Sequence, residues 1–167
     1  MITATGEFAI EAWVVPANVT QEGPARIISY SGGADTRNFT LGQTLYNYDY
    51  LLRTDKTNLN GQPALSTADA AEILQASLQH VVVNYDSVNG RRIFVNGRFT
   101  GDTDNTEVGN FADWNDSYAF VLGNEVSGDI PWAGSIRMVA IHNRVLSTEQ
   151  VIQNFDVGIG QKFFLLF

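Results

Sequence analysis

Residues 132–158 read WAGSIRMVAIHNRVLSTEQVIQNFDVG, and this stretch does most to decide the fold. The alternation over 132–142 predicts a β-strand. A helix over 148–156 follows, and its start is well defined. Ser147 is a natural N-cap, and Gln150 completes an S-x-x-Q capping box that satisfies backbone N–H groups of the first turn. One short capped helix therefore lies near the end of a chain whose other signals are nearly all β.

The rest of the chain consists of short apolar runs separated by turn residues. The strands predicted from these runs are 7–15, 25–30, 38–42, 46–53, 78–86, 91–95, 98–100 and 118–123, with a last one at 162–167. Asn96-Gly97 predicts a type I′ turn and hence an antiparallel hairpin. The segment 64–77 admits either a short helix capped by Thr67 or a loop that carries a strand. Strands at this spacing predict an all-β fold: a two-sheet antiparallel β-sandwich, or jelly roll, with one short C-terminal helix.

The length and composition are those of one globular domain. The chain has 167 residues, of which 44% are hydrophobic, and it contains no cysteine, which excludes disulfides and thiolate metal ligands. We expect a single domain over residues 1–167. The chain ends in FFLLF, whereas chain ends usually lie in solvent, and this predicts a domain cut from a larger protein. It shows no signal-peptide pattern and no apolar run of transmembrane length.

The charge balance is acidic. The chain has 10 Lys and Arg against 18 Asp and Glu, a formal net charge of −8. Such a field repels phosphate groups, so it argues against nucleic acid and anionic membranes as partners. It suits a bound cation or a neutral ligand, and it is equally explained by solubility alone.

A series of segments in a fixed order resembles one known family. The segments are GEFAIEAWV at 6–14, RNFTLGQ at 37–43, HVVVNYD at 80–86, RRIFVNG at 91–97, DWNDSYAFVLGNE at 113–125 and WAGSIRMVAIHNRVLSTEQV at 132–151. Together they are similar to the laminin-G-like branch of the concanavalin A-like jelly rolls. The resemblance implies two antiparallel sheets packed face to face. It also implies a secreted or cell-surface module, extracellular or periplasmic, of a larger bacterial protein. Members of this family mainly bind carbohydrate or protein, often with calcium.

Catalysis is not expected from the carboxylates and histidines of the chain. A glycosidase needs two carboxylates that face each other across a cleft, and the Glu-x-Asp-x-x-Glu pattern of the superfamily's glucanases does not occur. Glu7 and Glu11 share one face of the first strand, where Glu11, beside Trp13, is expected to be a satisfied or rim carboxylate. His80 and His142 lie in predicted strands and have no obvious partners. We expect both to be structural or surface residues and the protein not to be an enzyme.

Two acidic loops are the candidates for a calcium site. Calcium binds six to eight oxygens from carboxylates, amides and backbone carbonyls. Asn124, Glu125 and Asp129 lie in one loop, and Asp113 and Asp116 flank Trp114 in the loop before it. No regular calcium-loop spacing is present. The alternative is a pair of solvated loops in which Asn and Asp side chains cap turns.

The candidate sugar platform is aromatic. Tyr46, Tyr48 and Tyr50 recur at period two and therefore share one face of a strand. If that face is exposed, the rings can stack on pyranose faces, and if it faces the interior, they are core. The opposite face carries an Asn and an Asp, which favours tyrosines that are at least partly buried. Trp114, in an acidic loop, is either an exposed binding residue or a plug for the sandwich end.

These interpretations lead to one expected function with one alternative. The domain is expected to be a monomeric, non-catalytic recognition module that binds carbohydrate, with or without calcium. The alternative is a structural or protein-binding spacer, which predicts an exposed apolar or edge-strand surface. Arg53 closes an apolar run and is expected to meet Glu11 or Glu125, because a buried guanidinium without a partner is costly.

Overall fold

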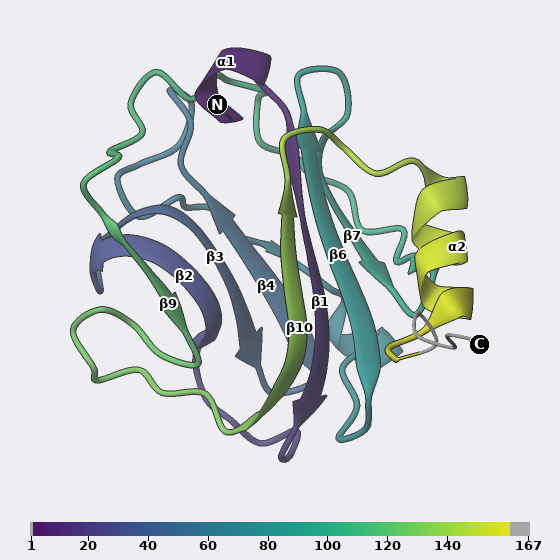
Figure 1. Ribbon diagram of the computed structural model, residues 1–167. Coiled ribbons are helices and arrows are strands. Elements are labelled where there is room, and N and C mark those ends of the chain that lie inside the picture. Colours follow the sequence, from purple (N-terminus) through teal and green to yellow (C-terminus); the bar gives the residue numbers. More distant parts are fainter. Residues whose placement is uncertain (1, 161–167) are drawn as a thin grey trace, which may run out of the picture.

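The computed structural model describes residues 2–160 and shows two antiparallel sheets packed face to face (Figure 1). In sheet A the strand order is β10-β1-β6-β7-β8, and in sheet B it is β5-β4-β3-β2-β9. The strands of sheet A are β1 (Phe8–Pro16), β6 (Gln79–Asp86), β7 (Gly90–Val95), β8 (Arg98–Phe99) and β10 (Gly134–His142). Those of sheet B are β2 (Ala25–Gly33), β3 (Thr36–Thr44), β4 (Asn47–Leu52), β5 (Leu65–Ser66) and β9 (Ala119–Leu122). The predicted all-β sandwich is confirmed.

Strand β1 shows how the apolar alternation builds the core. Its inward residues Phe8, Ile10, Ala12 and Val14 are fully buried between the sheets. Each large apolar side chain buried in this way stabilises the fold by roughly 1.5–3 kcal/mol. The neighbouring strand β6 adds buried valines to the same face. Val83, for example, pairs with Ile10 and lies in the same core. The same period-two pattern thus determines the core face of neighbouring strands.

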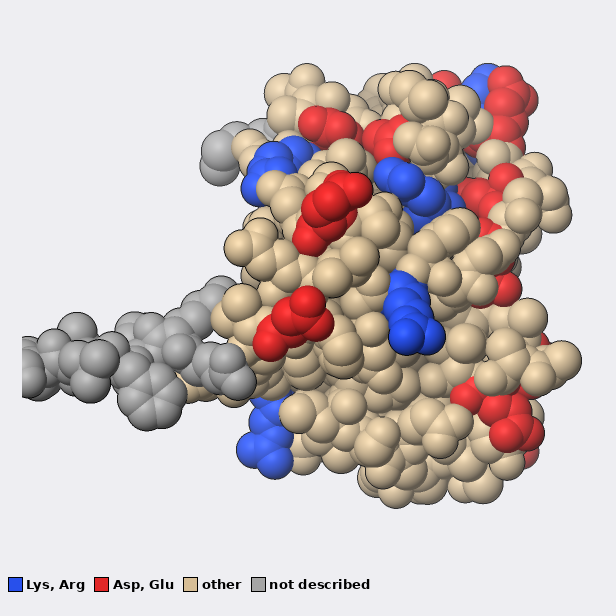
Figure 2. All heavy atoms as spheres, turned by 90° about the vertical axis from the view of Figure 1, so that its right-hand side faces the viewer, with Lys and Arg blue, Asp and Glu red and all other residues tan. Residues whose placement is uncertain are grey.

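The longer of the two α-helices in residues 2–160, α2 (Thr148–Val157), covers the outer face of sheet A at the right of Figure 1. The predicted capping box is present: Gln150 N–H donates to the Ser147 hydroxyl, and Ser147 N–H donates to the Gln150 side chain. Leu146 and Val151 pack with Ala9 and residues of β6 and β7 in a second apolar cluster. On this side of the molecule, Figure 2 shows acidic and basic side chains interspersed among uncharged ones.

The segment 64–77, for which the sequence left two possibilities, is a loop that carries a strand. It contains β5 and one turn of 3-10 helix, η1 (Asp69–Ala71). The Thr67 hydroxyl does not cap a helix, because it accepts a hydrogen bond from the backbone N–H of Tyr48 at 3.0 Å. Tertiary contact with β4 therefore outcompetes the local helical signal.

The two ends of the described chain differ from expectation in one respect. A four-residue helix, α1 (Ile2–Thr5), precedes β1 and was not predicted. The strand predicted over 162–167 lies outside the described residues. None of the helices between residues 2 and 160 has the length and the apolar run that a bilayer-spanning segment needs.

Candidate functional site

A cleft of about 970 Å³ opens at one end of the sandwich, where α1, the loop 101–117 and the end of β10 meet. Tyr30 of β2, Phe111 and Trp114 give it an aromatic wall. The half-buried Trp114 packs edge-on against Phe8, with ring centroids 5.4 Å apart, and its indole N–H donates to the Arg53 carbonyl at 2.7 Å. Trp114 thus plugs the sandwich end, as one of the two interpretations expected, and it also lines the cleft, while its role in binding stays a prediction.

Polar side chains surround this aromatic wall. Asn38, Asp116, Asn143 and Arg144 all line the cleft. Asn38 is anchored by two hydrogen bonds to the backbone of Asn115: its amide donates to the carbonyl at 2.8 Å, and its side-chain oxygen accepts from the N–H at 2.9 Å. These bonds hold the loop that carries Trp114. The cleft therefore combines fixed aromatic rings with amide, carboxylate and guanidinium groups, a combination suited to a small polar ligand.

The proposed tyrosine platform does not form. Tyr48 and Tyr50 are fully buried in the core, and the Tyr48 hydroxyl donates to the Gln79 side chain at 2.8 Å. Burial raises the pKa of both phenols, so they stay neutral. Tyr46 precedes β4 and is 38% exposed. The platform prediction is wrong for Tyr48 and Tyr50 because β4 lies inside sheet B, where these positions face sheet A. The polar residues on the opposite face were the signal that favoured this core placement.

The predicted calcium ligands of the loop after β9 serve other partners. Glu125 is buried, and its carboxylate accepts from Arg26 Nε at 3.1 Å, from Arg37 Nη1 at 3.2 Å and from the Ser31 hydroxyl. The Asn124 side-chain oxygen accepts two backbone N–H groups of its own loop, at 2.8 and 3.1 Å. This residue therefore caps a turn, as the alternative interpretation expected.

The remaining candidate ligands lie apart from one another. Asp113, Asp116 and Asp129 are exposed and belong to two different loops. Among residues 2–160, no group of three or more His, Asp or Glu side chains is placed to hold a metal ion. The predicted residues thus do not fit calcium as a set, and calcium binding by the protein stays a prediction.

An ion pair with Glu125 was expected for Arg53, but two other, buried arginines form it. Arg26 and Arg37 share the single carboxylate of Glu125, so their two positive charges face one negative charge. Burial and the neighbouring Arg26 lower the pKa of Arg37 to about 10, against the effect of Glu125, so Arg37 remains charged at neutral pH. The prediction that Glu125 pairs with an arginine is confirmed, but the expected arginine, Arg53, is wrong. Arg26 and Arg37 come from β2 and β3, which meet Glu125 only in the folded sandwich.

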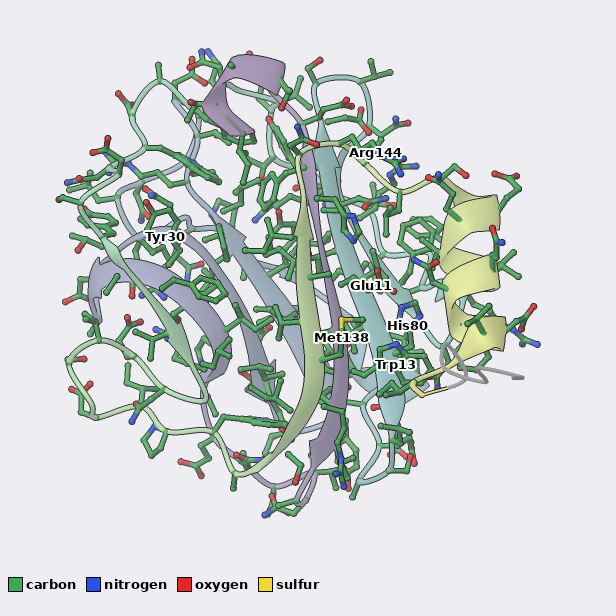
Figure 3. The ribbon with its side chains drawn as sticks, in the orientation of Figure 1. Glu11, Trp13, Tyr30, His80, Met138 and Arg144 are labelled. Atoms are coloured by element: carbon green, nitrogen blue, oxygen red, sulfur yellow. The ribbon has the colours of Figure 1, made fainter. Side chains whose placement is uncertain are left out.

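The two histidines have a partner that the sequence did not reveal. His80 Nε2 lies 2.9 Å from one oxygen of Glu11, and His142 Nε2 lies 3.1 Å from the other, which also accepts from Asn154 of α2 at 3.1 Å. Figure 3 shows Glu11, Trp13 and His80 between sheet A and α2. Burial raises the pKa of Glu11, but hydrogen bonds and charges of the two histidines bring it below its usual value. The cluster binds the helix to the sheet, which is a structural role.

Comparisons with known proteins agree with this architecture. A family model described as the concanavalin A-like lectin/glucanases superfamily matches residues 1–152. A search among curated proteins found no match. A CBM40 domain of the Ruminococcus gnavus IT-sialidase has a TM-score of 0.69 and 19% identity, over 91% of this chain and 84% of that one.

Two further solved structures are larger than this chain. A putative carbohydrate binding protein from Bacteroides ovatus has a TM-score of 0.62 and 16% identity, over 90% of this chain and 41% of that one. The binding domain of botulinum neurotoxin DC, in complex with rat synaptotagmin II, has a TM-score of 0.63 and 15% identity, over 92% of this chain and 36% of that one. The chain thus spans less than half the length of these two proteins. At such identities the likeness concerns the fold, but the family model covers most of the sequence. The laminin-G-like resemblance is therefore confirmed, and the protein belongs to the concanavalin A-like lectin/glucanase superfamily.

Proposed function

We propose that the protein is a non-catalytic recognition module that binds carbohydrate in the cleft at the sandwich end. The observation that carries this proposal is the cleft itself, in which Tyr30 and Trp114 lie beside Asn38, Asp116 and Arg144. Aromatic rings pack against the apolar face of a pyranose ring, and the polar groups are suited to its hydroxyls. We further propose that the module works as part of a larger secreted or cell-surface protein.

The rigidity of the cleft supports binding. Trp114 is held by its hydrogen bond to Arg53 and by rings on several sides, and Asn38 is held by Asn115. A site whose side chains are already ordered loses less conformational entropy when the ligand binds. The names of two fold neighbours, a CBM40 domain and a putative carbohydrate binding protein, point to the same class of ligand.

The arrangement of carboxylates supports a non-catalytic role. Hydrolysis of a glycosidic bond uses two carboxylates about 5–10 Å apart across a groove. Among the described residues that line the cleft, Asp116 is the one carboxylate. Glu11 is covered by α2, and Glu125 is engaged by two arginines.

Titration against a panel of soluble polysaccharides, by calorimetry, tests the proposal. We expect at least one glycan to bind, and Asp116→Ala to weaken its binding about tenfold, as the loss of a hydrogen bond to a charged group predicts. Asp113→Ala is the matched control, since it removes the same charge from the same loop at a residue that does not line the cleft. If no glycan binds, or if both variants weaken binding equally, the cleft is not the carbohydrate site.

A further inference from the structure

Strands β9 and β10 are free edges of the two sheets and lie on the same side of the sandwich (Figure 1), and the surface between them is called the opening below. Strand β9 pairs with β2, and β10 pairs with β1. Within residues 2–160, neither strand has a sheet partner on its other edge. Both edges therefore present backbone N–H and C=O groups on which a further strand can pair.

The inward side chains of β9 are exposed although they occupy core positions. Leu122 lies opposite Ile28 in the register, and Phe120 lies opposite Tyr30. Directly opposite residues share one face of a sheet, and Ile28 is fully buried in the core. Phe120 and Leu122 thus belong to the interior face, yet they are 46% and 48% exposed. A core position that is half in solvent lacks a neighbour.

Strand β10 shows the same pattern from the other sheet. Ile141 lies opposite Ile10, and Val139 lies opposite Ala12. Ile10 and Ala12 are fully buried, whereas Ile141 is 43% exposed and Val139 is only partly buried. Inward apolar residues of both free edge strands are therefore partly exposed to solvent. Exposed apolar side chains at core positions make this side of the sandwich a candidate interaction surface.

We propose that this opening binds an extended peptide segment of a partner protein, which adds a strand to the free edge of β10. The partner segment carries apolar side chains at every second position, and these fill the space against Phe120, Leu122 and Ile141. Strand β10 is the better template because it has 9 residues, whereas β9 has 4. Main-chain hydrogen bonds along the edge supply affinity, and the apolar positions supply specificity, as in other cases of strand addition.

Charge at both ends of the opening further defines the partner. Asp116 precedes β9 and Asp129 follows it, and both are exposed. Neither takes part in a salt bridge within the described chain. The partner segment is therefore expected to carry Lys or Arg at its two ends, and its binding is expected to weaken with salt, because exposed charges are screened. Asp116 and Ile141 also line the cleft proposed for carbohydrate, so a bound glycan is expected to compete with the peptide, but the inference does not depend on carbohydrate binding.

A fluorescent peptide, KKVTVTVTVKK, tests the proposal by anisotropy at low salt. We expect it to bind at least tenfold more tightly than KKVVVVTTTKK, which has the same composition without alternation. N-methylation of the alternate peptide residues whose backbone N–H groups would donate to β10 removes these donors and is expected to abolish binding. Phe120→Ser and Leu122→Ser are each expected to weaken binding at least tenfold. Val88→Ser is the matched control, because Val88 is an apolar residue that is 85% exposed and lies in the β6–β7 hairpin, away from the opening. This substitution is expected to leave peptide binding unchanged.

Several results would overturn the proposal. Equal binding of the two peptides would show that the opening does not recognise alternation. Retained binding in a folded Leu122→Ser variant, as judged by its Tm, would place the peptide elsewhere. A concentration-dependent dimer of the unmodified protein that Leu122→Ser disrupts would assign the opening to a second copy. Peptide binding that appears only in a chain ending at Gly160 would assign it to residues 161–167. Glycan binding is measured separately, so its failure is distinguishable from failure here.

Discussion

Replacing Glu125 by Gln is expected to destabilise the fold strongly, because Glu125 neutralises two buried arginines. The side chains of Glu125 and Arg37 are 0% exposed and that of Arg26 is 5% exposed. Gln keeps the shape of Glu but removes its charge, so both guanidinium groups stay buried and lose their one salt-bridge partner among the described residues. Removing one partner of a buried ion pair costs about 3–5 kcal/mol, which is a large part of the roughly 5–15 kcal/mol that stabilises a typical domain.

Urea unfolding at pH 7, followed by tryptophan fluorescence and circular dichroism, measures this loss. For a chain of this length, about 3–5 kcal/mol corresponds to a fall in Tm of about 6–20 °C. Asp129→Asn is the matched control: it removes one carboxylate from the same loop at an exposed position, and such surface changes usually stay within about 0.5 kcal/mol. A loss below about 1 kcal/mol in Glu125→Gln would refute the reasoning, since it would mean that the arginines are hydrated or have another counter-charge.

Three further predictions concern the helix contacts and the metal. The pKa of Glu11 is below its usual 4.5, so its ionised form contributes stability that is complete above pH 4.5 and is lost as the pH falls below that value. Between pH 6 and 3 the urea midpoint of the unmodified protein should therefore fall more steeply than that of Glu11→Gln. Parallel curves for the two proteins would contradict this. Ser147→Ala removes the helix cap and is expected to cost about 0.5–2 kcal/mol, whereas Ser147→Asp, which retains an acceptor, should cost much less. If the protein binds calcium, millimolar calcium is expected to raise the Tm and EDTA to reverse the rise, and an unchanged Tm would contradict the calcium prediction.

Much of the fold was predictable because its signals are local. The alternation of Phe8, Ile10, Ala12 and Val14 already defines one face of a strand, and the S-x-x-Q box already defines a helix start. These patterns depend on side chains within a few residues of each other, so they have the same meaning in the folded protein. The segment 64–77 is the exception, because Thr67 bonds to β4 instead of capping a helix.

The candidate site was predictable only in part. Trp114 was singled out by its place in an acidic loop, and it does line the cleft. Its neighbours Tyr30, Asn38 and Arg144 gave no signal, because they come from β2, β3 and the link after β10 and meet only when the sandwich forms.

The sequence by itself determined the family, the two-sheet class, the core face of β1 and the capped helix. Only the tertiary structure decided the use of each polar group. Glu125 looks like a calcium ligand until Arg26 and Arg37 are brought against it, and His80 and His142 look unpartnered until the fold brings both against Glu11 of β1. The physical reason is that strand and helix signals come from side chains near in sequence, whereas ion pairs, the cleft and the open edge arise from strands that are adjacent in space and distant along the chain.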